Sequence, residues 1–336
     1  MNRKMGFPRA SAEPLTMDEF KQFLVANNWN GKHLHRQMKK YAALVRCMGG
    51  SLNKTYRTIA HAWTKDDSRY WVRDRNIKRV IQHYGQDDQR TAAWHSKRSE
   101  MITASEVGYI VEGTPSQRHE ILMRKLRPGS QEEGRNVGLS NPLVWGTKLE
   151  PIAKRVYETQ TKCTIRDVSC VQHPRISFLG ASPDGIIQCP EDRERHHALV
   201  EFKCPISRKI GGEVPRGYYH QMQLQMECAG VDECEYVEFQ FKTCYYSEWV
   251  DFKQTKGIFA CYDDGRIEEW NNPPGPIEEG RLVYWILMGV HRDLVERDPK
   301  WLETHLPVLK AFWEEVCQHR TAGTIPDKPG VLKFTL

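Results

Sequence analysis

Two short stretches decide the fold that we expect of this chain: Ser182-Pro183-Asp184-Gly185, and Leu199-Val200-Glu201-Phe202-Lys203. The first lies between two apolar runs, at 176–179 and 186–189. An apolar run, a Pro/Gly turn and a second apolar run indicate strand, turn and strand. The second stretch alternates as a further strand, and the two stretches together predict a sheet that carries charged groups at one point.

The charged residues of these stretches are expected to converge. Side chains alternate along a strand, so Glu201 and Lys203 point to one face while Phe202 points into the core. A hairpin turn at Asp184 would bring its carboxylate beside Glu201. Two such carboxylates repel one another unless a cation neutralises them, and hard oxygen ligands suit magnesium or manganese. A neighbouring lysine can then orient or deprotonate a metal-bound water that attacks a phosphodiester.

Each piece also has an ordinary explanation when taken alone. Asp-Gly is a common turn, and Glu-x-Lys is a common solvent-facing pair on a strand. The combination is more specific, because the turn precedes an apolar strand that carries the second motif. Sixteen residues, 185–200, separate Asp184 from Glu201 and include a charged loop at 191–197.

A third carboxylate, Glu150, precedes the turn. We expect it to open an amphipathic helix whose apolar face begins at Leu149, with Pro151 in the first turn. An acid at a helix N-terminus is stabilised by the helix dipole, which is the simpler explanation.

A helix is predicted at 218–229, where Tyr218, Gln221 and Gln225 share one face. Glutamines can hydrogen-bond a phosphate or a metal-bound water. A solvated polar face is the usual explanation for such a row.

The remaining pattern predicts an α/β fold, with a mixed sheet flanked by helices. Helices are expected at 105–111 and after Asp298, which would cap the last helix. The other expected elements are a loop at 127–141, a strand at 236–241, a hairpin partner at 245–252 and a last core strand at 282–290.

The first part of the chain reads as a separate helical region, with a polar boundary at 86–89. We therefore expect a helical N-terminal region at 1–88 and a second domain at 89–325. Basic residues and aromatics interleave between residues 31 and 98. This pattern is typical of phosphate binding and equally of a solvated helical face, so both interpretations remain, as does protein binding.

Composition excludes several classes. The chain has 336 residues and a formal net charge of +6, which permits a nucleic-acid partner without demanding one. Its ten cysteines contain no CxxC pair, which argues against zinc ribbons and fingers. No apolar run approaches the ~20 residues of a membrane span, and no secretory signal is visible. We therefore expect an intracellular protein, in the cytoplasm or nucleus of a host cell, and not a secreted one.

The motifs resemble, in order, those of the lambda exonuclease-like (YqaJ) viral recombinase family of PD-(D/E)XK nucleases. The resemblance covers roughly residues 90–320. It rests on Trp94-His95 to Arg98, Ile102-Thr103-Ala104-Ser105, Trp145-Gly146 with Glu150, Ser182-Pro183-Asp184-Gly185, Glu201-Phe202-Lys203-Cys204-Pro205, Tyr218 to Gln223, and Val295-Glu296-Arg297-Asp298.

The resemblance implies a role for each matching residue. Asp184, Glu201 and the carbonyl of Phe202 would hold magnesium ions, two in number, with manganese as a substitute. Lys203 would activate water, and Glu150 and Gln221 would lie beside the metals. A 5′-phosphate end of DNA would be bound by Arg98, Ser105 and Ser182, and by Arg208, which follows a segment one residue shorter than the family's.

The resemblance also implies an activity: a metal-dependent deoxyribonuclease that digests linear duplex DNA 5′ to 3′ in viral recombination, replication or genome processing. It implies a ring-shaped trimer, and a single-strand annealing protein as a partner. The alternatives are a structure- or sequence-directed endonuclease on the same fold, and a catalytically inactive nucleic-acid-binding protein. The end-binding set favours the exonuclease, and the intact Asp184, Glu201 and Lys203 argue against the inactive protein.

Overall fold

A computed structural model describes residue 70 and residues 72–85, 89, 91–127, 138–192 and 194–329. The chain forms two compact units, 1–75 and 76–336. Most of the predicted helical region at 1–88 lies outside the described residues, as does most of the loop at 127–141. None of the described helices is long and apolar enough to cross a membrane.

A seven-stranded mixed sheet forms the centre of the second unit, in the order β2-β5-β6-β7-β10-β8-β9. Only β6 and β7 pair in parallel, while each other neighbouring pair is antiparallel. The strands are β2 (Thr164–Arg166), β5 (Gly185–Gln188), β6 (Leu199–Lys203), β7 (Glu233–Cys244), β8 (Lys256–Tyr262), β9 (Ile267–Glu269) and β10 (Gly280–Glu296). The expected α/β class with a mixed sheet is confirmed.

Three short strands make a second sheet, in the order β1-β4-β3. They are β1 (Ile102–Thr103), β3 (Val171–Gln172) and β4 (Leu179–Ala181). The hairpin expected around Asp184 is therefore wrong, because β4 pairs with β1 and β3 whereas β5 pairs with β2 and β6. Asp184 lies on the link where the chain leaves one sheet for the other.

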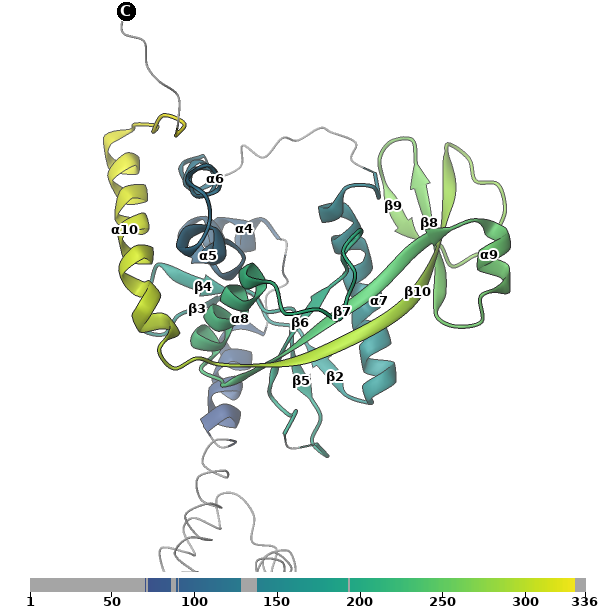
Figure 1. Cartoon of the computed structure of the whole chain (residues 1–336), viewed down its shortest axis with the longest axis horizontal. Helices are drawn as coiled ribbons and strands as arrows, with labels where there is room; N and C mark the ends of the chain where they lie inside the picture. The colour runs from purple at the N-terminus through teal and green to yellow at the C-terminus, as the bar shows by residue number, and fades with distance from the viewer. Residues whose placement is uncertain are drawn as a thin grey trace, which may run out of the picture. The chain divides into compact units, whose positions relative to one another are not determined.

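Helices cover both faces of the large sheet, as Figure 1 shows. α7 (Pro142–Thr161) packs on one face in a core that contains Leu149, Phe202 and Phe239. A second core contains Leu199 and Tyr236. The helices near this second core are α5 (Ala104–Val111), α6 (Pro115–Leu126), α8 (Arg216–Ala229) and α10 (Trp301–Ala322), and α4 (Ala92–Ser99) precedes β1. Because alternate residues of β6 enter different cores, the strand presents Glu201 and Phe202 to opposite faces.

The start of α7 corrects one expectation. The helix begins at Pro142, where the side chain of Asn141 accepts hydrogen bonds from the N–H groups of Leu143 and Val144. Glu150 and Pro151 therefore lie inside the helix and not in its first turn. Asn141 is the N-cap and Pro142 the first-turn proline, the place that was expected for Pro151.

The strands β7 and β10 continue well past β6, towards β8, β9 and α9 (Tyr246–Asp251) at the far end of the sheet (Figure 1). The hairpin partner expected at 245–252 is wrong, since this segment forms α9. The ring of Trp249 lies 5.5 Å from that of Tyr284 on β10, and its Nε1 donates to the carbonyl of Gly257. Packing of aromatic rings on a finished sheet outweighs the strand preference of an aromatic-rich segment.

Two helix ends were also tested. Gly230 ends α8 in the left-handed conformation, with a φ of 70°, as expected. Asp298 does not cap α10, whose N-cap is Lys300. Its carboxylate instead accepts from the N–H of Lys300 in the turn before the helix.

The helical residues 76–84 belong to the second unit. Ile77 and Val80 are buried in its core, and Asn76 Nδ2 donates to the carbonyl of Gly230 at 2.6 Å. The division between compact units thus falls at 75/76, before the polar stretch at 86–89 on which the expected boundary was placed.

Candidate active site

Glu201 lies among charged and polar side chains of β6, α8 and the link before β5. It is 0% exposed and points from β6 towards α8, because its neighbours Val200 and Phe202 fill the core under α7. The parallel pairing with β7 sets Glu201 opposite Tyr236 and Lys203 opposite Glu238. A fully buried carboxylate is costly unless its oxygens are hydrogen-bonded and its charge is offset.

Both oxygens of Glu201 are occupied by donors. Oε1 accepts from Gln221 Nε2 at 2.5 Å and also from Lys203 Nζ. Oε2 accepts from Gln225 Nε2 at 2.7 Å. Gln221 and Gln225 are one turn apart on α8, so the helix presents two amides to one carboxylate. The carboxylate is therefore held in one orientation by protein groups alone.

Asp184 meets this strand at its backbone. Its Oδ2 accepts a hydrogen bond from the N–H of Phe202 at 2.7 Å. Phe202 is the residue between Glu201 and Lys203, so the Asp184 carboxylate lies against this part of β6. Burial, with the charges of Glu201 and Glu150, raises the pKa of the Asp184 carboxyl well above its usual value. The predicted convergence of carboxylates is thus present, although it arises from a link between two sheets.

Lys203 offsets part of this negative charge. Burial alone lowers the pKa of its ammonium group, but the carboxylates of Glu201 and Asp184 outweigh burial and raise it. The Nζ atom also lies 4.6 Å from the centre of the Tyr218 ring, on the first turn of α8. In this arrangement Lys203 carries its proton.

A second polar group surrounds Arg98, at the end of α4. Its guanidinium contacts three hydroxyl oxygens: Ser182 at 3.3 Å, Thr103 at 3.4 Å and Ser105 at 3.1 Å. Trp94 Nε1 donates to the same Ser182 hydroxyl at 3.1 Å, and the guanidinium carbon lies 4.2 Å from the centre of the Trp94 ring. The structure therefore brings together Arg98, Ser105 and Ser182, three of the four residues that the resemblance assigned to a phosphate end.

The charge of Arg98 is offset only in part. Burial lowers the pKa of its guanidinium, and the charge of Glu106 counters this without outweighing it. Glu106 is itself paired with Lys125 at 2.8 Å and caps α5 through Thr103. A desolvated guanidinium that faces hydroxyls rather than a carboxylate is well suited to bind an anion.

Arg208 lies elsewhere. Its guanidinium binds the carboxylate of Glu238 and donates to the hydroxyl of Tyr236 at 3.3 Å. Glu238, which is buried, also accepts from the N–H of Gly211 at 3.0 Å. These contacts connect the segment after β6 to β7. Arg208 therefore stabilises the structure beside Lys203 and, among the described residues, makes no hydrogen bond with the Arg98 group. Its predicted role with phosphate stays a prediction.

The donor set around Asp184 fits a divalent cation. Three acidic side chains, Asp184, Glu201 and Glu150, are close enough for the other two to raise the pKa of Asp184. Carboxylate oxygens are the ligands that magnesium and manganese prefer.

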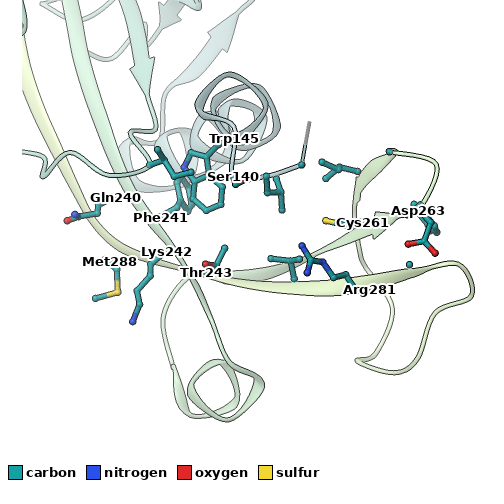
Figure 2. Close-up of a pocket in the computed structure, with 18 residues that line it drawn as sticks. Ser140, Trp145, Gln240, Phe241, Lys242, Thr243, Cys261, Asp263, Arg281 and Met288 are labelled. Atoms are coloured by element: carbon teal, nitrogen blue, oxygen red, sulfur yellow. The ribbon is translucent and has the colours of Figure 1, made fainter. Parts of the chain in front are cut away.

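A large groove opens on the far part of the sheet, beside β7 where β6 has ended (Figure 2). Its volume is about 1100 Å³, and its walls include Trp145 on α7, Phe241 on β7 and Arg281 on β10. Ile206, three residues after Lys203, also lines it, so the groove begins near the end of the strand that carries Glu201.

Two contributors received too little weight from the sequence. For the row that contains Gln225, a solvated face was the usual explanation beside contact with a phosphate or a metal-bound water, yet Gln225 is 0% exposed and binds Glu201. Trp94 was quoted only as part of a motif, yet it contacts both Arg98 and Ser182. Its place one turn before Arg98 on a helix was the signal available.

Comparison with known proteins agrees with this geometry. Residues 93–232 match the YqaJ-like viral recombinase domain, and this range contains Arg98, Glu150, Asp184, Glu201 and Gln221. The motifs from which the resemblance was inferred thus lie largely within the matched range. The suspected family is confirmed, and the distal strands from β7 onward lie beyond the matched range.

Viral proteins are among the relatives. The chain is 24% identical over 329 residues to the uncharacterized protein R354 of Acanthamoeba polyphaga mimivirus, covering 79% of this chain and 58% of that protein. It is 26% identical over 179 residues to protein D345L of African swine fever virus (isolate Tick/Malawi/Lil 20-1/1983), covering 46% and 51%. The chain thus spans little more than half the length of these relatives.

A solved structure with partial similarity is the alkaline exonuclease LHK-Exo from Laribacter hongkongensis. It shares 23% identity and a TM-score of 0.46, over 69% of this chain and 95% of that one.

Proposed function

We propose that this YqaJ-like domain is a magnesium-dependent deoxyribonuclease that removes nucleotides from the 5′ ends of linear duplex DNA. The observation that carries the proposal is the hydrogen bond from the Phe202 N–H to Asp184, which sets a second carboxylate against the strand of Glu201 and Lys203. Carboxylates gathered beside a lysine suit metal-assisted phosphodiester hydrolysis. The family of residues 93–232 and the viral relatives support a nuclease that serves viral recombination.

Asp184, Glu201 and the carbonyl of Phe202 would hold the ion, with Glu150 beside it. Bound there, Mg²⁺ supplies charge neutralisation and an activated water. We propose two ions, with Mn²⁺ as a substitute. The remaining tasks fall to the chain's own side chains: Gln221 fixes Glu201, and Lys203 holds a proton at Nζ beside the reacting phosphate.

The Arg98 group supports action at an end. Arg98 would bind a terminal 5′-phosphate in a bidentate contact, with the hydroxyls of Ser105 and Ser182 as further donors. A terminal phosphate carries more negative charge than an internal diester, so a cation next to the carboxylates discriminates between them. The link that contains Ser182 also contains Asp184, which couples the bound end to the carboxylates.

The test compares three DNA substrates in the presence of Mg²⁺: a linear duplex with 5′-phosphates, the same duplex with 5′-hydroxyls, and a covalently closed circle. We expect the phosphorylated duplex to be degraded fastest and the circle to persist. Cleavage of the circle would favour the endonuclease. Binding of all three without any cleavage, in Mg²⁺ or Mn²⁺, would favour the inactive binding protein.

Assembly and partners remain proposals. The resemblance implies a trimer that encircles duplex DNA, and a single-strand annealing protein that receives the product strand. Sedimentation of the purified chain tests the first. A trimer mass supports a ring, whereas a monomer that still degrades DNA would remove it.

A further inference from the structure

We propose that Gln225 is a positioning residue for the metal site, which locks Glu201 in its metal-binding orientation before any ion arrives. This inference rests on the proposed function, because it takes Glu201 as a metal ligand. Gln225 lies on α8 and is 0% exposed, and its Nε2 donates to Glu201 Oε2 at 2.7 Å.

The two oxygens of the Glu201 carboxylate accept hydrogen bonds from opposite sides of the site. Oε1 already receives Lys203 and Gln221, both from the more open side of the site. Oε2 receives Gln225 from the core side, since Gln225 is fully buried and Gln221 only partly. Rotation of the carboxylate would break bonds at both oxygens at once. Gln225 therefore restricts the rotation of the Glu201 carboxylate that Gln221 and Lys203 alone would still permit.

The amide of Gln225 can lie only one way round. Turned over, its oxygen would face Glu201 Oε2, and two acceptors repel. With Nε2 on the carboxylate, Oε1 is left buried without a hydrogen-bond partner among the described residues. An unsatisfied buried acceptor destabilises a fold, and an apolar side chain of similar length would avoid it. The contact with Glu201 is thus the reason for a glutamine at this position.

Gln223, two residues away on the same helix, provides a matched control. It is also 0% exposed, but its Nε2 donates to the carbonyl of Glu296 at 2.8 Å and its Oε1 accepts from the N–H of Asp298 at 2.8 Å. Both glutamines stabilise the packing of α8. Gln225 is the one whose amide reaches a carboxylate of the site.

The experiment measures direct Mn²⁺ binding by calorimetry, without DNA, in the wild type, Gln225→Met and Gln223→Met. Partners that orient a metal ligand typically contribute about 10- to 100-fold to metal affinity. We expect a loss of about that size for Gln225→Met. For Gln223→Met we expect less than about a twofold change, although both variants should unfold at lower temperature.

A second readout separates positioning from a purely structural role. Gln225→Met should regain most of the wild-type cleavage rate at saturating Mn²⁺, because the side chain does not touch DNA. Where Gln225→Met fails to fold, Gln225→Ser replaces it, since serine leaves room for a water. Its Mn²⁺ affinity should fall by more than the change in Gln223→Met.

Two results would overturn the inference: wild-type Mn²⁺ affinity in the Gln225 variants, or an equal loss in the Gln223 variant. The proposed function fails differently. If Asp184→Asn binds Mn²⁺ as the wild type does, the carboxylates are not the metal site at all. If Asp184→Asn loses Mn²⁺ affinity while the Gln225 variants keep it, only the positioning role of Gln225 is excluded.

Discussion

The Glu201 group and the groove beside β7 lie on one continuous sheet, yet they are built in opposite ways. Around Glu201 a buried carboxylate has donors on both of its oxygens. In the groove the walls are open, with Met288 52% exposed and Ile206 39% exposed. The family match at residues 93–232 contains the Glu201 group, whose neighbouring strand β7 lies outside the match. Most residues that line the groove also lie outside it.

Single atoms should matter at Glu201 and hardly at all in the groove. The stability of a buried charge depends on each of its partners, because removal of a partner leaves a desolvated charge that nothing offsets. A solvent-filled groove tolerates change, since water replaces what a substitution removes. Substitutions should therefore have large, all-or-none effects at Glu201 and small, graded effects in the groove.

The largest effect is expected at the carboxylates. Asp184→Asn and Glu201→Gln should each reduce cleavage at least about a thousandfold, equivalent to about 4 kcal/mol in the barrier. The measurement is the initial rate on a phosphorylated linear duplex in saturating Mg²⁺. A rate near that of the wild type would remove the substituted residue from the site.

The fold should survive the Asp184 substitution, and metal-free stability gives the control. The pKa of Asp184 is raised in the folded protein, so its protonated carboxyl contributes stability that is fully present below its unfolded pKa of about 3.9. That contribution is lost as the pH rises through the folded value. At neutral pH, metal-free Asp184→Asn should therefore melt no lower than the wild type, and a much lower melting temperature would mean that the lost cleavage reflects unfolding.

Lys203→Met should have the next largest effect. Proton transfer or charge stabilisation by a single side chain contributes about 10²- to 10⁴-fold, so cleavage should fall by that factor. Binding of Mn²⁺ and of duplex DNA should persist, because the carboxylates and the Arg98 group remain. A variant that loses DNA affinity but keeps its rate at saturating DNA would make Lys203 a phosphate contact instead.

Arg98→Met should chiefly erase the preference for phosphorylated ends. A charge-assisted hydrogen bond contributes about 1.5–3 kcal/mol, or roughly 10- to 150-fold in that preference. The rate ratio between 5′-phosphate and 5′-hydroxyl duplexes measures it.

Lys97, next to Arg98 on α4, is the matched control, since its ammonium lies over the Tyr84 ring at 4.5 Å. Lys97→Met should leave the ratio unchanged. Equal ratios in the wild type and Arg98→Met would place end recognition elsewhere.

The smallest effect is expected in the groove. Arg281→Glu should weaken duplex binding less than about tenfold. The slope of log affinity against log salt concentration should become shallower by about one, which corresponds to one phosphate contact. The rate at saturating DNA should not change. Arg266, exposed and paired with Asp264 at 2.7 Å in the turn between β8 and β9, is the control outside the groove. A thousandfold loss of the saturating rate in Arg281→Glu would break the comparison between the two regions.

Sequence patterns predicted the parts of the site that local periodicity controls. Glu201 and Lys203 share a face because side chains alternate along any strand. The approach of Asp184 was expected for the wrong reason, since the apolar runs on either side of its turn enter different sheets. Pairing partners are set by distant segments such as β1, which the local pattern does not contain.

Burial of polar residues was the weakest part of the prediction. A solvated face is the usual explanation for glutamines on a helix, whereas Gln225 is buried against the charge of Glu201, 24 residues away. Similarly, the aromatic residues of α9 favour a strand locally, but the ring of Tyr284 offers a packing surface that a helix fits. In both cases a tertiary partner decides what the local sequence leaves open.

Asp184 and Glu201 are proposed to hold the metal on which cleavage of DNA depends. The most direct test is the cleavage of a 5′-phosphorylated duplex by the wild type and Glu201→Gln, first in excess chelator and then after addition of Mg²⁺. We expect no cleavage by either protein in chelator, recovery of the wild type on addition of Mg²⁺, and no recovery of the variant. Cleavage by the wild type in chelator, or recovery of Glu201→Gln to the wild-type rate, would contradict the proposed metal site.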